Sequence, residues 1–266
     1  MPQDHVTEMD HRRDTIWHRI VTEARHWLRS EWSLTEVGAH WDATEDYDEI
    51  NERTYTYFRR FSDAFRFSDL PDRAVTLDFC ARTGNGSKFF FEQGKIGSLV
   101  CADVSFRMGQ ICIQQAGAAG IEPFVWVPVT DYRLPFGDNK FDLVLCFETL
   151  EHFAAPERFV HEFGRITKPG GKLVVTTPNL LWEPVHALAA ITGAHHSEGP
   201  HRFIRYARLL DMIMGNGFQI ERVETTILVP GGPRVVLRLG EWIEQHAGRR
   251  LMRWLGLRRI VVSRKL

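Results

Sequence analysis

The chain has 266 residues, of which 44% are hydrophobic and 25% are charged, and a formal net charge of −1. These values are typical of a globular protein with one α/β domain and additions to it. The near-neutral charge gives no overall attraction to nucleic acid or to an anionic membrane. No apolar run approaches the ~20 residues of a membrane-spanning helix, and residues 1–30 contain no segment of signal-peptide type. We therefore expect a cytoplasmic protein that binds no nucleic acid.

The four cysteines lack the spacing of metal-ligand pairs, and we expect buried, reduced thiols at Cys80, Cys101, Cys112 and Cys146. Ahead of them, apolar residues recur at helical spacing over residues 14–32 and aromatic residues over 47–67. The sequence thus predicts two helices in an N-terminal helical region, residues 1–70. Aromatic stripes of this kind usually belong to a core. The functional interpretation, which we adopt, is that residues 1–70 form a helical cap that covers a ligand site and places Tyr47 and Tyr55 against a substrate.

The stretch from Ala74 to Ser87 combines a β-branched run, an acid and a glycine-rich loop. Ala74 to Leu77 reads as a strand that ends at Asp78, and Gly84 lies in the loop before an apolar helix start. Strand, acid, loop and helix in this order form a nucleotide crevice at the carboxyl end of a strand in open α/β sheets. A tight connection between strand and helix is the simpler alternative.

Strand and helix patterns then alternate, which predicts βαβ units and a parallel sheet. A strand over 98–104 carries Asp103, which lies 25 residues after Asp78 and is placed to accept hydrogen bonds from ribose hydroxyls. Capping of a helix start is the structural alternative for both acids. Further elements are predicted as a helix over 105–119, strands over 123–129 and 141–147, a helix over 156–167, a turn over 168–171 and a strand over 172–177.

These motifs resemble those of class I S-adenosylmethionine-dependent methyltransferases. In the glycine-rich motif Asp78, Thr83 and Gly84 match, whereas Cys80 and Arg82 replace the first two glycines. The segment FDLVLCFETLEHF, residues 141–153, resembles the motif after the fourth strand in small-molecule methyltransferases. The segment WDATEDYDEINERTYTYFRRF, residues 41–61, resembles the helix before the core of quinone-biosynthesis methyltransferases.

The resemblance implies a Rossmann-like, seven-stranded, mostly parallel sheet within residues 71–266, with a C-terminal antiparallel hairpin strand and S-adenosylmethionine as cofactor. Arg82 is expected either to crowd this ligand or to pair with its carboxylate. The cofactor contacts implied by the motifs are Asp78, Cys80, Gly84, Asp103, Val104, Thr130, Asp131 and Phe147.

His152 is the candidate base, because it follows the fourth strand and histidine ordinarily titrates near neutrality. Glu151 is the second candidate, and packing at a helix start is the structural alternative for His152. Glu148, Glu151 and His152 share one helix face, which is compatible with a divalent ion, but we predict no metal. Loop histidines are mostly solvated; those at 195, 196 and 201 are weaker candidates, and of these we choose His201 for the substrate.

Residues 180–203 are irregular and are interpreted as a substrate-facing insertion. Beyond them we expect a helix over 204–214, a strand over 217–228, a helix over 235–255 and a strand over 259–265. Basic residues gather near the C-terminus, at Arg249, Arg250, Arg253, Arg258, Arg259, Arg264 and Lys265. A solvated face is the interpretation we favour for them, and contact with an anionic membrane surface is the alternative.

The function predicted from these features is in-line transfer of a methyl group from S-adenosylmethionine to a small-molecule acceptor. The substitutions at Cys80 and Arg82 support an alternative, a catalytically silent methyltransferase fold that serves as a binding or scaffold subunit. An NAD-dependent enzyme is disfavoured because the glycine fingerprint is incomplete. The acceptor, the atom methylated and the oligomeric state are not fixed by the sequence.

Overall fold

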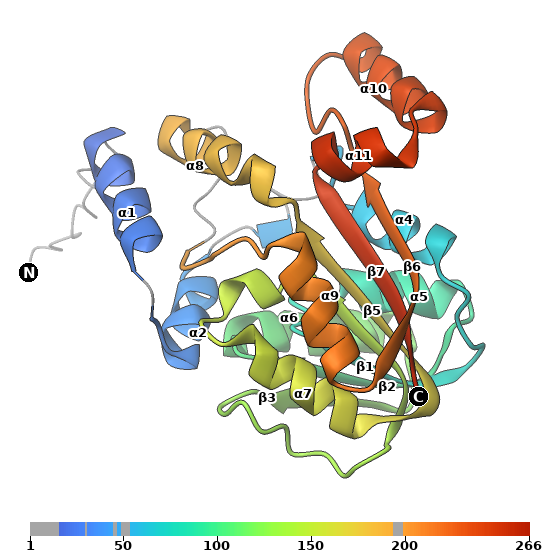
Figure 1. Cartoon of the computed structure of the whole chain (residues 1–266). Coiled ribbons are helices and arrows are strands. Elements are labelled where there is room, and N and C mark those ends of the chain that lie inside the picture. Colours follow the sequence, from blue (N-terminus) through green and yellow to red (C-terminus); the bar gives the residue numbers. More distant parts are fainter. Residues whose placement is uncertain (1–15, 30, 45–46, 49–53, 194–198) are drawn as a thin grey trace, which may run out of the picture.

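The computed structural model describes residues 16–29, 31–44, 47–48, 54–193 and 199–266. Within these ranges the chain forms a sheet of seven strands in the order β3-β2-β1-β4-β5-β7-β6 (Figure 1). The strands are β1 (Ala74–Phe79), β2 (Ile96–Asp103), β3 (Phe124–Pro128), β4 (Phe141–Phe147), β5 (Thr167–Pro178), β6 (Phe218–Thr226) and β7 (Arg258–Lys265).

Strands β1 to β5 are parallel, and β7 runs antiparallel to both β5 and β6. The predicted mostly parallel sheet with a C-terminal antiparallel hairpin is therefore confirmed. Asp78 in β1 is in register with Cys101 in β2 and Leu145 in β4. The carboxyl ends of these three strands consequently meet at one edge of the sheet, where the acids at the ends of β1 and β2 lie close together.

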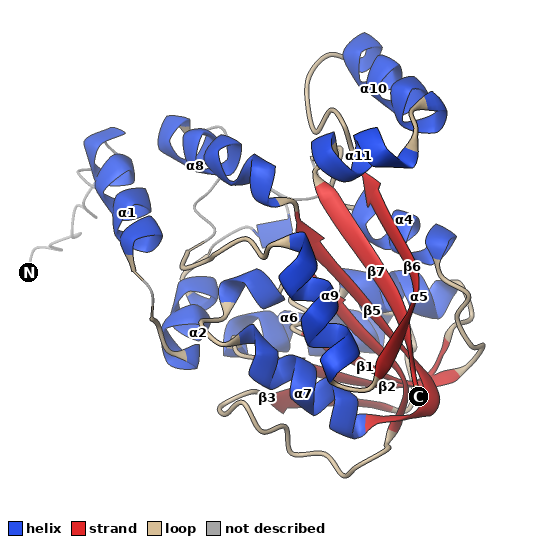
Figure 2. Cartoon of the chain, viewed as in Figure 1, coloured by secondary structure: helices blue, strands red, loops and turns tan. Residues whose placement is uncertain are grey.

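Helices cover both faces of the sheet (Figure 2). Helices α7 (Pro156–Ile166) and α9 (Tyr206–Gly215) pack together on one face. Helices α4 (Arg59–Phe67), α5 (Asn85–Glu92) and α6 (Phe106–Ala118) cover the other face. One cluster of buried apolar side chains joins the two layers, and it includes all four cysteines. The prediction of buried, reduced thiols is confirmed.

The N-terminal helices differ from the predicted pair. Helix α1 (Ile16–Leu28) lies within the range expected for the first helix. Helix α2 (Leu34–Asp42) was not predicted, although Ser33 and Glu36 form a reciprocal capping box at its start. The single helix expected over 47–67 is wrong, because residues 54–58 form turns and α4 begins only at Arg59.

Three corrections concern the C-terminal half. The region expected to be irregular contains η3 (Leu180–Trp182) and α8 (Glu183–Thr192), with proline in the first turn and a left-handed Gly193 at its end. The helix expected over 235–255 is divided at residues 247–248 into α10 (Arg234–His246) and α11 (Arg249–Leu255). The turn expected at 168–171 is looped out inside β5, so that Thr167 and Lys172 pair with residues only two apart in β4.

Helices α8, α10 and α11 all lie at the end of the sheet where β5 finishes and β7 begins (Figure 1). Asn179, just after β5, donates to the carbonyl oxygens of Trp254 at 2.8 Å and Gly256 at 2.9 Å. This side chain fixes the connection between α11 and β7 beside the start of α8. None of the helices in the described part of the chain is both long and apolar enough to cross a bilayer.

Candidate functional site

Two buried carboxylates lie at the carboxyl ends of β1 and β2. The Oδ2 of Asp78 accepts a hydrogen bond from the Ser87 hydroxyl at 2.5 Å. The two oxygens of Asp103 accept from the backbone N–H groups of Ser105 and Arg82, each at 2.9 Å. Each aspartate is at most 2% exposed. The chain thus holds two buried acids at adjoining strand ends, a site we call the crevice, with amide and hydroxyl donors as their partners. Asp78 also lines a small cavity at this site.

Burial governs the protonation of this pair. Burial, with a smaller contribution from the neighbouring charge of Asp103, raises the pKa of Asp78 to about 7, against the opposing effect of the hydrogen bond from Ser87. Burial also raises the pKa of Asp103, where the Arg82 guanidinium and the backbone donors oppose the shift. The two carboxylates therefore have little positive charge near them. A ligand that brings a cation or hydroxyl donors would stabilise their ionised forms.

The glycine loop is built without its usual first two glycines. Cys80 and Arg82 both have φ of +54°, in the left-handed region that side chains disfavour. Gly84 has φ of +88° and is the N-cap residue of α5, and a Cβ at Gly86 would lie 2.8 Å from the Phe61 ring. The backbone therefore adopts the conformation that glycines favour, and it is strained at Cys80 and Arg82.

The N-terminal region closes over this loop. Asp48 accepts hydrogen bonds from the Thr83 hydroxyl at 2.6 Å and from the Asn85 amide at 3.0 Å. The space left between cap and loop is about 20 Å³, lined by residues that include Tyr47 and Phe61. Pockets for small ligands usually measure roughly 300 Å³ or more, so an adenosyl group enters only if these side chains move.

The other predicted cofactor contacts differ in their position relative to this crevice. Phe147, at the end of β4, stacks on Phe90 and lines the small cavity. Val104 is buried, with its carbonyl oxygen 2.6 Å from the place of a Cβ on Gly38. Thr130 and Asp131 lie beyond β3 and are exposed, and Asp131 accepts from the backbone of Arg133 at 2.8 Å. The structure does not bring these last two into the cavity.

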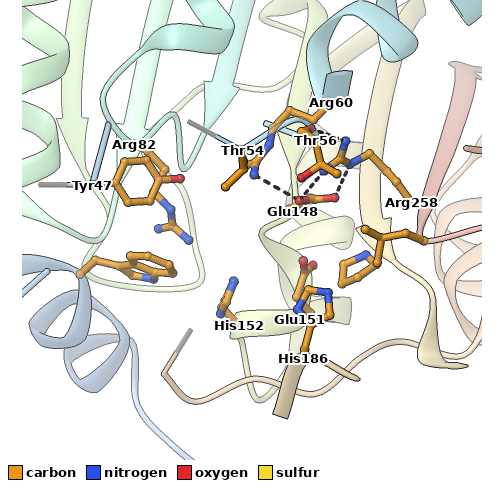
Figure 3. Close-up of a pocket in the computed structure, with 13 residues that line it drawn as sticks. Tyr47, Thr54, Thr56, Arg60, Arg82, Glu148, Glu151, His152, His186 and Arg258 are labelled. Atoms are coloured by element: carbon orange, nitrogen blue, oxygen red, sulfur yellow. Dashed lines mark hydrogen bonds and ion pairs between the residues drawn. The ribbon is translucent and has the colours of Figure 1, made fainter. Parts of the chain in front are cut away.

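A second, more polar pocket adjoins the crevice, and we call it the histidine pocket (Figure 3). It measures about 70 Å³ and lies beyond the ends of β4 and β5. Its walls come from the N-terminal region, the glycine loop, the segment after β4, α8 and the start of β7. The lining residues are Trp41, Tyr47, Thr54, Thr56, Arg60, Arg82, Glu148, Glu151, His152, Pro178, His186, Leu257 and Arg258.

His152 and Glu151 lie on the short helix η2 (Leu150–His152) and face this pocket (Figure 3). The His152 ring is 5.3 Å from the Trp41 ring, and its carbonyl oxygen accepts from the Trp32 indole at 2.8 Å. Glu151 is 1% exposed and accepts a hydrogen bond from the Thr177 hydroxyl at 3.2 Å. The two predicted catalytic candidates therefore share one buried site.

Glu148 is the centre of a charge network in the same pocket. It accepts from the buried Arg258 guanidinium, one bond being 3.1 Å, and lies 3.4 Å from Arg60. Arg258 also donates to the carbonyl oxygen of Thr56 at 2.9 Å. Glu148 thus turns toward arginines, and in the described ranges no three potential ligands are grouped to hold a metal ion.

Arg82 connects the crevice and the histidine pocket. Its side chain is 8% exposed, and the guanidinium lies 3.8 Å above the Trp41 ring. It lines both cavities and points toward the space that His152 faces (Figure 3). The Arg82 side chain therefore lies at the boundary between the two cavities, although its backbone belongs to the glycine loop.

The structure places the three residues predicted to contact the substrate in different surroundings. Tyr47 lines both cavities. Tyr55 points elsewhere, because its hydroxyl bonds to Glu241 of α10, while its neighbours Thr54 and Thr56 line the histidine pocket. His201 lies outside the lining but its ring is 6.2 Å from that of His152. The histidines at 195 and 196 fall outside the described residues.

Sequence reasoning missed Arg60, Arg258, Trp41 and His186 as pocket residues. Arg60 and Trp41 belong to segment 41–61, whose aromatic pattern predicts a helix but does not show which of its side chains face a pocket. Arg258 was assigned to a basic C-terminal face, although it is 2% exposed. No local pattern marks a buried arginine that pairs with Glu148 across 110 positions of sequence.

The donor set can be tested against S-adenosylmethionine, the cofactor that the motifs imply. That molecule offers ribose hydroxyls, an ammonium group and a sulfonium, and Asp78 and Asp103 offer buried acceptor oxygens with raised pKa values. The polar groups therefore fit the cofactor, provided that the cap side chains over the 20 Å³ cavity move.

Comparison with known proteins supports the same assignment. Residues 77–175 match the methyltransferase domain family. The chain is 30% identical over 128 residues to the ubiquinone/menaquinone biosynthesis C-methyltransferase UbiE of Hydrogenovibrio crunogenus, a match that covers 47% of this chain and 50% of the relative. It is 31% identical over 107 residues to the demethylmenaquinone methyltransferase of Thermobifida fusca, covering 40% and 44%. The chain thus spans about half the length of these relatives, and the resemblance to methyltransferases is confirmed.

Solved structures share the fold. A chain of the complex between the Haloferax volcanii Trm112 methyltransferase activator and a methyltransferase has a TM-score of 0.65 at 17% identity, covering 86% of this chain and 97% of that one. The [4+2]-cyclase SpnF has a TM-score of 0.62 at 20% identity, covering 88% and 97%. Because this fold is found in a cyclase too, the fold alone does not fix the reaction.

Proposed function

We propose that the protein transfers a methyl group from S-adenosylmethionine to a small-molecule acceptor. The observation that carries the proposal is a pair of buried carboxylates, Asp78 and Asp103, beside a polar pocket that contains His152. The first site suits the cofactor, and the adjoining pocket suits an acceptor. In this proposal residues 1–70 act as a helical cap over both.

The cofactor would be held by groups at the strand ends. Asp103 would accept hydrogen bonds from ribose hydroxyls, and Asp78 and the Gly84 loop would face its amino-acid part. Cys80, Val104 and Phe147 would line the remaining crevice. When bound, the cofactor supplies a methyl group on a positively charged sulfur, which is a good leaving group.

The chain's own contribution is orientation, exclusion of water and movement of one proton. Holding two reactants in line can account for about 7–11 kcal/mol of a barrier. His152, which faces the pocket and is 3% exposed, would take the proton from the acceptor atom that becomes methylated. Glu151 is the alternative base, because its carboxylate lies in the same pocket.

The acceptor we propose is a small molecule with a flat ring. Trp41 and Tyr47 give the histidine pocket aromatic walls, and Arg82 gives it a cation that suits an ionised hydroxyl. The names of the curated relatives point to a quinone-type ring, so a short-chain naphthohydroquinone is a reasonable first acceptor to test.

A catalytically silent binding subunit is the second candidate. It is favoured by the strained Cys80 and Arg82 in place of glycines and by the aromatic side chains that fill the crevice. Under this alternative the cap does not open, and the protein neither binds S-adenosylmethionine nor consumes it.

A turnover assay separates the two. The full chain is incubated with S-adenosylmethionine and the naphthohydroquinone, and S-adenosylhomocysteine is quantified by mass spectrometry. His152→Gln should lower kcat by at least about a hundredfold and leave cofactor affinity unchanged. His161→Gln, at an exposed position of α7, is the matched control. Equal rates for both variants would contradict the role of His152, and lack of cofactor binding would support the silent subunit.

A further inference from the structure

Helix α10 is amphipathic but turns its polar side toward the protein. Glu244 accepts from the Arg59 guanidinium at 2.7 Å and from the Leu228 backbone at 2.9 Å, and Glu241 accepts from the Tyr55 hydroxyl. Gly240 is the one residue of α10 that is buried. The carboxylates therefore anchor this helix, whereas amphipathic helices normally bury their apolar side.

The opposite side of α10 exposes an apolar stripe. Val235, Leu239 and Trp242 are 78%, 56% and 58% exposed, and they recur at helical spacing. The next helix, α11, exposes Leu251, Trp254 and Leu255. We call these six side chains the α10–α11 face. About half or more of each of these side chains is exposed to solvent, and an exposed apolar surface of this kind is typical of an interaction site.

The exposed charge on these two helices is positive, although Arg249 also pairs with Glu224 of β6 at 3.3 Å. Five arginines on the two helices are exposed, and α11 has no acid. The two glutamates of α10 are engaged with Arg59 and Tyr55, away from the stripe. The exposed arginines are Arg234, Arg238, Arg249, Arg250 and Arg253. A second copy of the same face would set arginines against arginines, which disfavours self-association.

A cleft of about 670 Å³ adjoins the face between α4, β6, α10 and α11. Its lining includes six arginines and four acids, an excess of two positive charges. The arginines are Arg59, Arg66, Arg222, Arg249, Arg250 and Arg253. Arg59 pairs with Glu244, and Arg222 and Arg249 pair with Glu224. That leaves Arg66, Arg250 and Arg253 to contact phosphate groups in the cleft.

We propose that the α10–α11 face docks on an anionic phospholipid surface, with tryptophan and leucine entering the headgroup boundary and arginines contacting phosphates. Helices with arginine on one side and Trp or Leu on the other lie in the membrane interface in this way. The sequence favoured a solvated basic face, but it did not show that the apolar residues between the arginines are outside the core.

This docking would set the histidine pocket at the lipid surface. His186 of α8 and Leu257, two residues beyond α11, both line that pocket. The Trp182 indole at the start of α8 donates to the Leu255 carbonyl oxygen at 2.9 Å, which joins the two helices. Two of the residues that line the pocket therefore lie on or next to helices at the end of the sheet that carries the proposed docking face (Figure 1).

Co-sedimentation with vesicles tests the proposal without any need for turnover. The full chain is mixed with vesicles of phosphatidylcholine alone or of an equal mixture with phosphatidylglycerol. We expect binding to the mixed vesicles that falls with added salt, and at least about tenfold weaker binding to phosphatidylcholine alone. Equal binding to both, or binding to neither, would overturn the proposal.

Two pairs of variants locate the contact. Arg238→Glu with Arg250→Glu should weaken binding to the mixed vesicles at least about tenfold. Arg133→Glu with Lys140→Glu makes the same charge change at exposed residues after β3 and should have little effect. Equal losses in both pairs would mean that only overall charge matters, which would refute docking through this face.

A third pair tests the apolar stripe. Leu239→Ser with Trp242→Ser should weaken vesicle binding by about tenfold through lost apolar burial. Ile113→Ser with Val125→Ser, exposed on α6 and β3, is the control and should bind normally. Thermal melts establish that each variant is folded. A stable dimer in sedimentation velocity that the stripe variant abolishes would identify a second copy as the partner and overturn the lipid assignment.

Discussion

The crevice at β1 and β2 and the histidine pocket beyond β4 balance their buried charges differently. In the crevice, Asp78 and Asp103 are satisfied by hydroxyl and backbone donors, and the pKa of each is raised by burial. In the histidine pocket, Glu148 is neutralised by Arg258 and Arg60. The first site is short of positive charge and is suited to a ligand that brings it; the second is complete without one.

The largest effect should come from breaking the balanced pair. Glu148→Gln leaves the guanidinium of Arg258, whose side chain is 2% exposed, without its counter-ion. We expect the free energy of unfolding to fall by about 3 kcal/mol in chemical denaturation, because an uncompensated buried charge is costly. Glu157→Gln, whose partner Arg208 is 54% exposed, is the matched control and should cost less than about 1 kcal/mol. Similar losses in both variants would show that the pocket is solvated.

The lack of positive charge near Asp78 should make the free energy of unfolding depend on pH. The folded pKa of Asp78, about 7, lies above its ordinary value of 3.8, so its contribution is fully present below pH 4 and is lost as pH rises to 7. Asp78→Asn removes this loss. We therefore expect the stability of the variant, relative to the natural protein, to rise by about 2 kcal/mol or more over that interval. If the difference in free energy of unfolding between the two proteins does not change with pH, the pKa of Asp78 is not raised in the folded protein.

The same lack of positive charge predicts that the cofactor binds at Asp103. Asp103→Asn replaces an acceptor oxygen by an amide donor at the end of β2. The affinity for S-adenosylmethionine should fall by about 1.5 kcal/mol or more, which is roughly tenfold. Asp131→Asn, at an exposed position after β3, should change the affinity less. The reverse ranking in calorimetry would move the ribose site away from β2.

The smallest effect is expected at the boundary between the two sites. Arg82→Gly relieves a left-handed φ of +54° but loses the stacking on Trp41. Each contribution is about 1 kcal/mol, so the free energy of unfolding should change by less than that amount. A loss above about 2 kcal/mol would mean that the arginine makes a stronger contact than its stack on the indole.

The sequence predicted the central sheet well because its signals are local. Strand β4 was predicted with the bounds that the structure shows, and the antiparallel hairpin at the C-terminus was expected. Asp78, Asp103, Glu151 and His152 lie where motif order placed them, at adjoining strand ends. Periodic apolar runs and turn residues carry this information over short distances.

The parts that could not be predicted depend on distant contacts. The acid at 148 pairs with an arginine 110 positions away, and Tyr55 faces Glu241 of α10, 186 positions away. The sequence also does not show that α10 turns its polar side toward the protein. The helical period defines two faces but not which of them contacts the rest of the chain. Helix α2 is different, since its capping box was present in the sequence and was overlooked.

Calorimetric titration of the full chain with S-adenosylmethionine tests most directly whether the acid pair at β1 and β2 is a cofactor site. The account predicts one-to-one binding that Asp103→Asn weakens about tenfold or more and that Asp131→Asn leaves nearly unchanged. The absence of binding heat, together with an unchanged melting temperature at saturating cofactor, would contradict it.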